Sequence, residues 1–214
     1  MGDHREASSV RLDAFVDAAF AFAVTLLVIG GGAPPKAWTE LQAVMWRIPA
    51  FAVGFALLGM FWHAHVRWRR LCGSGGFAAV LLSFALVFLV LVYVYPLRMM
   101  ADSMIAYFSR QPNPLGHGDL GGLFTFYGLG FAGMSAVVSA LFGTGLGTAE
   151  AANRPVVRGE LGIWLILAAS GVLSALLAQF RLTVPFAPWV YALLPVAVGV
   201  FAFRHKWDEA PAAE

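Results

Sequence analysis

The sequence predicts an all-α membrane protein with six transmembrane helices in each subunit. Composition is the first reason, because 60% of the 214 residues are hydrophobic. Charge is the second, because only 12% of the residues are charged, about half of the roughly 25% typical of soluble domains. The third is spacing. Apolar segments of about 20 residues, the length that crosses a bilayer, recur along the chain and leave no separate soluble domain.

Each apolar segment ends at polar, Gly or Pro residues. The first stops at the Gly/Pro run 30–35, the second at the basic residues 67–70, and the third starts after the glycines of 73–76. The segments must be helices, because in lipid a spanning backbone has to satisfy its own hydrogen bonds, and the third segment lacks the alternation of a β-barrel strand. The predicted helices, in a single domain over 1–214, cover residues 12–30, 42–65, 76–98, 121–143, 160–179 and 184–204.

Basic residues in the short connections predict the orientation in the membrane. With the N-terminus inside, nine basic residues fall on the inner side: Arg5, Arg11, Arg67, Arg69, Arg70, Arg154, Arg158, Arg204 and Lys206. Five fall on the outer side: Lys36, Arg47, Arg98, Arg110 and Arg181. This excess predicts a multi-pass protein of the cell inner membrane with both termini in the cytoplasm. A net charge of +2 gives no sign of nucleic-acid binding.

The first segment carries acidic residues at its head. Asp13 and Asp17 lie in or beside the membrane, where ionisable residues are costly and usually face protein or water. Alternatively, both merely occupy the first helical turn, where acidic side chains favour the helix dipole. The acidic pair also argues against a cleaved secretory signal, which is the other interpretation of this short apolar run.

The first segment also has two distinct sides when about 100° is allowed per residue. One stripe holds Arg11, Phe15, Ala18, Phe22, Leu26 and Ile29, with Thr25 beside it, and the opposite side holds Asp13, Asp17, Phe20, Val24 and Leu27. A helix that stands at a central axis and is backed by its own subunit would show two such protein-facing sides. Asp17 would then point inward and hold the subunit together.

Cofactor motifs are weak in this sequence. Trp62 and His65 share a helix face, whereas His63 and His65 do not, so the histidines are poorly spaced for a metal or haem. Residues 128–133 fit the dinucleotide string GxGxxG, but they lie inside an apolar span and not in a βαβ unit. Close helix packing through small residues explains that string better. We therefore expect no cofactor and no metal site.

Several of these residues together resemble a known family. Arg11-x-x-x-Phe15-Val16-Asp17 is similar to the RxxxFSD signature that opens the first helix of the endolysosomal potassium channel family, transmembrane protein 175, and its bacterial relatives. The likeness continues through Thr25-Leu26-Leu27. Phe61-Trp62-x-x-His65 resembles the family's WxxHH element, and Tyr95-Pro96 fits the proline that closes the family's third helix.

The resemblance implies a potassium-permeable cation channel and not an enzyme. Bacterial members are homotetramers without a pore loop, in which the first helix of each subunit lines a central pore. The narrowest position falls on Phe22, with layers at Thr25 and Leu26, and the only small ion involved is the permeating potassium. A bracing network falls on Arg11, Phe15, Asp17, Trp62 and His65.

The sequence also departs from the family pattern. Val16 replaces the signature serine, Val66 replaces the second histidine, and Phe22 is bulkier than the usual Ile or Leu. A proton-conducting or proton-coupled transporter that uses Asp17 and His65 is the alternative function. A small membrane enzyme or haem protein is a weaker one, because the sequence lacks the ligand pairs that it would need, and a structural scaffold without ion flux is a third.

Overall fold

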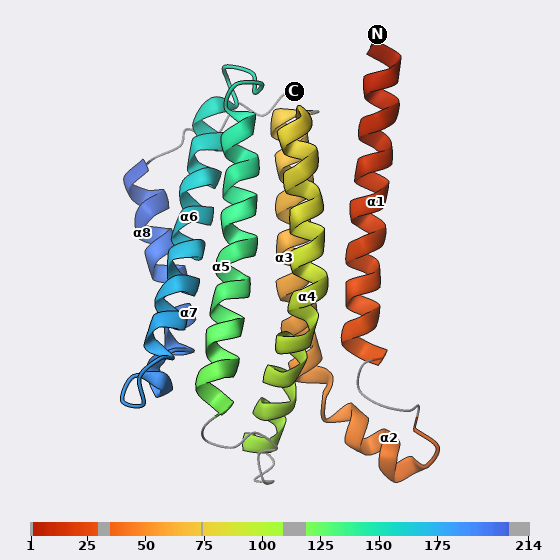
Figure 1. The fold of residues 1–214 in the computed structure, drawn as a ribbon, viewed down its shortest axis with the longest axis vertical. Coiled ribbons are helices and arrows are strands. Elements are labelled where there is room, and N and C mark those ends of the chain that lie inside the picture. Colours follow the sequence, from red (N-terminus) through yellow and green to blue (C-terminus); the bar gives the residue numbers. More distant parts are fainter. Residues whose placement is uncertain (1, 30–34, 74, 109–118, 206–214) are drawn as a thin grey trace.

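A computed structural model describes residues 2–29, 35–73, 75–108 and 119–205. Every regular element in these ranges is helical, which confirms the all-α class (Figure 1). In chain order they are α1 (Gly2–Ile29), α2 (Trp38–Met45), α3 (Ile48–Cys72), α4 (Phe77–Phe108), α5 (Asp119–Gly145), α6 (Arg154–Leu177), the 3-10 turn η1 (Val184–Phe186), α7 (Trp189–Ala192) and α8 (Leu194–His205).

Four described helices are long and apolar enough to cross a membrane. These are α3, the Phe77–Met100 part of α4, the Leu120–Gly145 part of α5, and α6. The segments Val184–Ala192 and Leu194–Arg204, bent by 41° relative to each other, make a fifth span if they are taken together. α1 is not among them, and its described part carries the charged residues Arg11, Asp13 and Asp17.

Two predicted helices are broken where proline enters the chain. The helix predicted over 42–65 is wrong at its start, because α2 ends at Met45 and α3 begins at Ile48 with proline in its first turn. Proline favours a helix start, where its missing N–H has no partner to lose. The helix predicted over 184–204 is likewise divided into η1, α7 and α8, and prolines stand at positions 185, 188 and 195.

The other helix boundaries differ less. α4 passes through Pro96 and continues to Phe108, so the prediction that this proline closes the helix is wrong. Neighbouring helices can satisfy the carbonyl that a proline frees inside a span. α3 continues seven residues past its predicted end at 65 to Cys72, where Gly73 adopts a φ of +71° that favours glycine. α5 matches the predicted 121–143 to within two residues at each end, whereas α6 begins six residues before the predicted 160–179 and α1 ten residues before the predicted 12–30.

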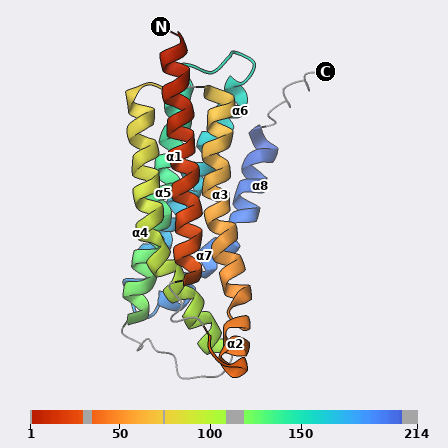
Figure 2. The ribbon, with the colours of Figure 1, turned by 90° about the vertical axis from the view of Figure 1, so that its right-hand side faces the viewer.

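The helices form a bundle with α1 at one edge and α6 to α8 at the other (Figures 1 and 2). Within the subunit α1 packs against α3 and α4. The closest pair is α5 and α6, where Gly128 and Gly171 face each other with room for no side chain. This contact confirms that the GxGxxG string serves helix packing.

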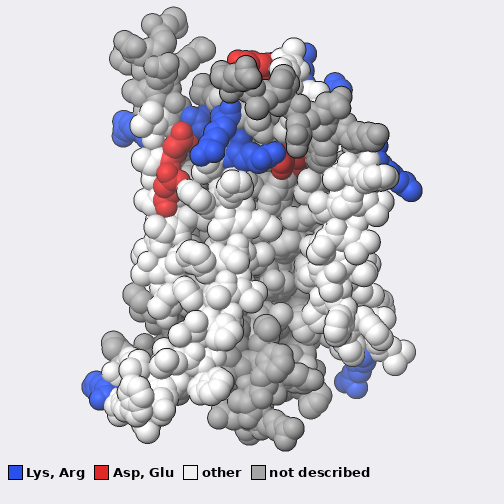
Figure 3. Space-filling view, turned by 180° about the vertical axis from the view of Figure 1, so that it is seen from behind, with Lys and Arg blue, Asp and Glu red and all other residues white. Residues whose placement is uncertain are grey.

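Charged side chains gather at one end of the bundle, and the middle of the face seen in Figure 3 carries none of them. At that end α3 finishes with Arg69 and Arg70 in its last turn. Arg67 of α3 also pairs with Glu160 of α6, with 2.6 Å between Nε and Oε1. Fewer basic side chains lie at the opposite end in this view, so the distribution agrees with an apolar belt that meets lipid between a strongly charged end and a weakly charged one.

Candidate functional site on the first helix

One face of α1 is buried within the subunit. Val16, Phe20, Ala23 and Leu27 are each at most 7% exposed and belong to the hydrophobic core shared with α3 and α4. Their spacing of four, three and four residues is that of a helix stripe that packs on its neighbours. Val16, at the signature's serine position, is fully buried, so its apolar side chain suits the place that it occupies.

The opposite face of α1 is left uncovered by its own subunit. Arg11, Phe15, Ala18, Phe22 and Thr25 are all exposed, and Phe22 is 56% exposed. They recur in alternating steps of four and three residues, the spacing of a seam along which helices meet around a common axis. Lipid, water or further copies of the chain can cover such a seam.

Two further positions of the predicted stripe behave differently. Leu26 is half-buried and packs against the core, so it lies beside the seam and not on it. The side chain of Ile29 lies outside the described residues. The Thr25 hydroxyl donates a hydrogen bond to the Ala21 carbonyl at 2.9 Å, which leaves its oxygen free to accept or to ligate.

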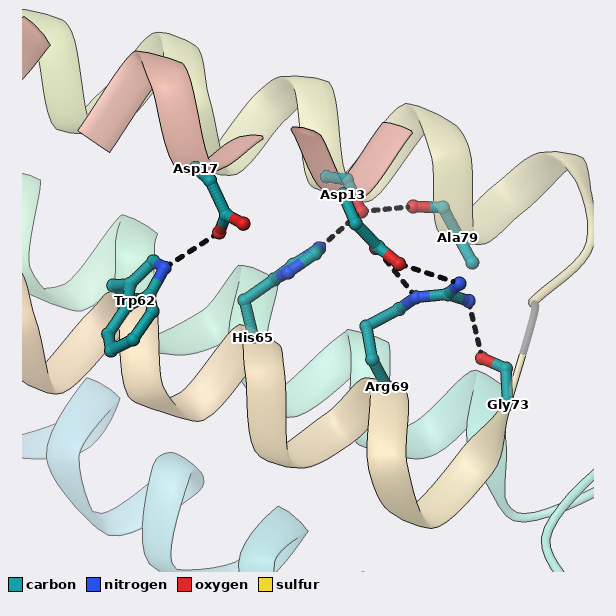
Figure 4. Close-up of polar contacts among 8 residues, drawn as sticks. Asp13, Asp17, Trp62, His65, Arg69, Gly73 and Ala79 are labelled. Carbon is teal, nitrogen blue, oxygen red and sulfur yellow. Dashed lines mark hydrogen bonds and ion pairs between the residues drawn. The ribbon is translucent and has the colours of Figure 1, made fainter. Parts of the chain in front are cut away.

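Polar contacts join α1 to α3 (Figure 4). The Trp62 indole N–H donates to the Asp17 carboxylate at 2.8 Å. Arg69 donates from Nε and Nη2 to the two oxygens of Asp13, at 2.7 and 3.0 Å. Its Nη1 also donates to the Gly73 carbonyl at 2.7 Å, which ties the end of α3 to the same guanidinium. A bidentate Arg–carboxylate pair fixes orientation as well as distance.

His65 lies between these two contacts but has a different partner. Its Nε2 is 3.0 Å from the Ser83 hydroxyl of α4, and both side chains are buried. The Ser83 hydroxyl donates to the Ala79 carbonyl at 2.9 Å, so we assign the hydrogen of the His65 contact to Nε2. Trp62, His65 and Arg69 thus connect α3 to both α1 and α4, and Phe15 adds a ring contact to Phe84 with centroids 5.1 Å apart.

Among the described side chains, no three His, Cys, Asp or Glu residues come together as a metal-binding group. What remains is a helix with one buried face, one exposed seam and polar contacts at one end. The contacts with α3 and α4 fix the position of α1 within the subunit, and its seam remains exposed for contact with something outside the subunit.

Three kinds of comparison with known proteins give matches. The family model of "Endosomal/lysosomal potassium channel TMEM175" matches residues 11–96, which hold α1 to the middle of α4. The resemblance to this family is confirmed. A relative from Marivirga tractuosa described as "Potassium channel" is 36% identical over 97 residues, which are 45% of this chain and 39% of the relative. The chain therefore matches about two fifths of that relative's length.

The third match concerns the fold. The crystal structure of a variant of the potassium channel MtTMEM175, in complex with a nanobody–MBP fusion protein, superposes with a TM-score of 0.79. The two chains are 24% identical, and the match covers 92% of this chain and 93% of the other. The TMEM175 fold thus extends beyond the part that the family model matches.

The TMEM175-like region contains two residues whose roles sequence reasoning missed. In the sequence, Arg69 serves only to predict the orientation in the membrane, yet Arg69 binds Asp13. For Asp13 itself, the sequence leaves open whether it merely favours the helix dipole. Ser83 has no motif around it. The spacing in the sequence hints at the Asp13–Arg69 contact, because Asp13 is four residues from Asp17 on α1 and Arg69 is seven residues from Trp62 on α3. Both pairs share a face.

The Asp13–Arg69 pair should contribute measurably to stability. We expect Asp13→Asn and Arg69→Gln to be non-additive, with a coupling free energy of about 1 kcal/mol, because the bidentate pair is only partly exposed. Unfolding of the two single variants and the double variant by denaturant measures this coupling. Asp13→Asn combined with Arg70→Gln is the matched control and should be additive. Additivity in the Asp13–Arg69 cycle itself would contradict the prediction.

Proposed function

We propose that the chain is one subunit of a potassium-permeable cation channel, in which α1 of each copy lines a central pore. The uncovered seam of α1 is the observation that supports the proposal most. A single subunit leaves Phe15 and Phe22 in contact with lipid or water, whereas several copies around an axis cover them. The family resemblance and the relatives described as potassium channels support potassium as the ion. By the same resemblance the assembly is a homotetramer.

In this proposal Phe22 forms the narrowest ring. Its side chain lies in the middle of the seam, and apolar rings close a pore by excluding water from it. Thr25 lies one turn further along, about 4.5 Å up the helix axis, and its hydroxyl offers the ion a polar ligand after the apolar ring. Leu26, half-buried beside the seam, would contribute a smaller part of a second apolar layer.

The bracing network explains how the ring is held in place. Asp17 with Trp62, and Asp13 with Arg69, tie α1 to α3 at about one and a half and two and a half turns before Phe22. Such contacts let the subunit set the position of α1, and a small rotation of α1 would move Phe22 into or out of the axis. We propose passive permeation that opens in this way and involves no catalytic step.

The proposed membrane arrangement has six spans. α1 supplies the first, α3 to α6 supply the next four, and the bent pair α7–α8 supplies the last, with no pore loop. The charged end of the bundle would face the cytoplasm of a cell inner membrane, together with both termini, by the excess of basic residues.

Ion gradients across liposomes test the proposal. With the purified protein in liposomes, the reversal potential should follow the potassium gradient and not a pH gradient. A reversal potential that follows pH, together with saturable transport, would favour the proton-coupled alternative. The comparisons do not favour that alternative, and the structure pairs its two residues with separate partners, Asp17 with Trp62 and His65 with Ser83.

A further inference from the structure

A groove lies at the end of the bundle opposite the charged end, between α5 and the chain that follows α6. It encloses about 500 Å³. Its lining comes from the first turns of α5, from the residues after α6 and from η1: Gly121, Gly122, Thr125, Phe126, Leu129, Ala178, Gln179, Arg181 and Val184. α1 lies across the bundle from this groove, so the proposed pore does not use it (Figure 1).

The groove exists because α5 begins with small residues. At Gly121 an added Cβ would come within 3.0 Å of the Ala178 carbonyl oxygen, so this glycine brings the two chain segments close together. At Gly122 an added Cβ would meet nothing within 4 Å, so its side of the helix is open space. A large side chain at 122 would therefore fill the groove without displacing the backbone.

The two walls of the groove differ in chemistry. Phe126 and Leu129 are about half exposed and continue the apolar surface of α5 toward the middle of the span. The other wall is polar, with the Gln179 amide donating to the Thr125 hydroxyl at 2.8 Å and to the Ala175 carbonyl at 3.1 Å. Arg181 adds a positive charge, and none of the lining residues is acidic.

Charge and position together indicate the occupant. Arg181 is the one charged residue among the described residues that line the groove, and its guanidinium favours an anionic group there. α5 and α6 are both apolar enough to span a membrane, and lipid surrounds such helices. We propose that the groove binds one phospholipid, with its phosphate at Arg181 and an acyl chain along Phe126 and Leu129.

This lipid site goes beyond the proposed ion permeation and does not depend on it. A nonspecific lipid annulus would need only the apolar belt. A specific site needs both the charge of Arg181 and the open space at Gly122. Substitution of Arg181 removes the charge, and a large side chain at position 122 fills the space. Because the groove lies across the bundle from α1, loss of the lipid should leave the ion preference unchanged.

Lipid binding to the purified, delipidated full chain tests this proposal. Native mass spectrometry during titration with dioleoyl phosphatidylglycerol should show one tight site per subunit. Arg181→Gln should weaken that site about fivefold, the effect of one basic residue on an anionic headgroup. Gly122→Leu should weaken it at least as much by filling the groove. Gly199→Leu is the matched control, because an added Cβ at Gly199 also meets nothing within 4 Å, and it should bind as the unaltered chain does.

The competing explanations give different results. Dioleoylglycerol, which has no phosphate, should not displace the phospholipid. Displacement by millimolar inorganic phosphate would overturn the proposal in favour of a free-anion site, and an altered subunit number in Gly122→Leu would overturn it in favour of an interface between copies. Unchanged binding in Arg181→Gln would overturn it as well, and this variant decides the matter alone if Gly122→Leu does not fold.

Discussion

Replacing Phe22 by alanine should raise potassium flux into liposomes on the order of tenfold. The side chain is 56% exposed on the seam of α1, so its truncation widens the proposed constriction without opening a cavity in the core. A permeation barrier lowered by about 1.4 kcal/mol is enough for this factor. Phe22→Asn should raise the flux as well, because a polar ring holds water where an apolar ring excludes it. A potassium-sensitive dye inside liposomes of matched protein content reports the potassium flux through both variants.

The control for this experiment is the same substitution elsewhere on the surface. Phe203 on α8 is 80% exposed and lies at the opposite edge of the bundle from α1. Phe203→Ala should therefore leave the flux unchanged. If Phe22→Ala and Phe22→Asn both conduct like the unaltered protein, Phe22 is not the constriction, and the seam of α1 has another use.

Replacing Gly171 by alanine should strongly destabilise the fold. A Cβ at this position would lie 2.6 Å from the carbonyl oxygen of Gly128 and 2.7 Å from the backbone nitrogen of Ala132. Both are backbone atoms of α5, so they can move only if the two helices separate. We expect a loss of about 3 kcal/mol, at the upper end for overpacking, and Gly171→Leu should yield no folded protein. Denaturant unfolding followed by circular dichroism gives the free energy of unfolding.

Gly59 provides the matched control on another spanning helix. An added Cβ there would meet nothing within 4 Å, so Gly59→Ala should leave stability unchanged or raise it by up to about 1 kcal/mol through better helix propensity. The two Gly→Ala variants thus have opposite expected signs. A Gly171→Ala protein as stable as the unaltered one would show that α5 and α6 do not need this close approach.

The local signals in the sequence predicted much of the first helix and its surroundings. The position of Phe22 relative to Asp17 on α1 follows from helix periodicity alone, and the structure leaves Phe22 exposed and joins Asp17 to Trp62. The interpretation of 128–133 as a packing motif follows from its apolar context. Such inferences succeed because spacing along a helix determines which side chains share a face.

Other features could not be predicted from local signals. Spacing places Asp13 on the face of Asp17 and Arg69 on the face of Trp62, but it does not show that these two faces, 56 positions apart in the chain, meet each other. The continuation of α4 through Pro96 depends on neighbouring helices, because in isolation a proline breaks a helix. The prolines that divide the last span are visible in the sequence, but the 41° angle between its two parts is not.

The sequence by itself predicted a helical membrane protein whose first helix resembles a known channel signature, because hydrophobic length and residue spacing are local properties. The tertiary structure alone decided which face of α1 its own subunit covers and which face it leaves exposed. That choice depends on how α3 and α4 pack against α1, and side-chain shape and hydrogen bonds between distant segments determine such packing only once the helices meet.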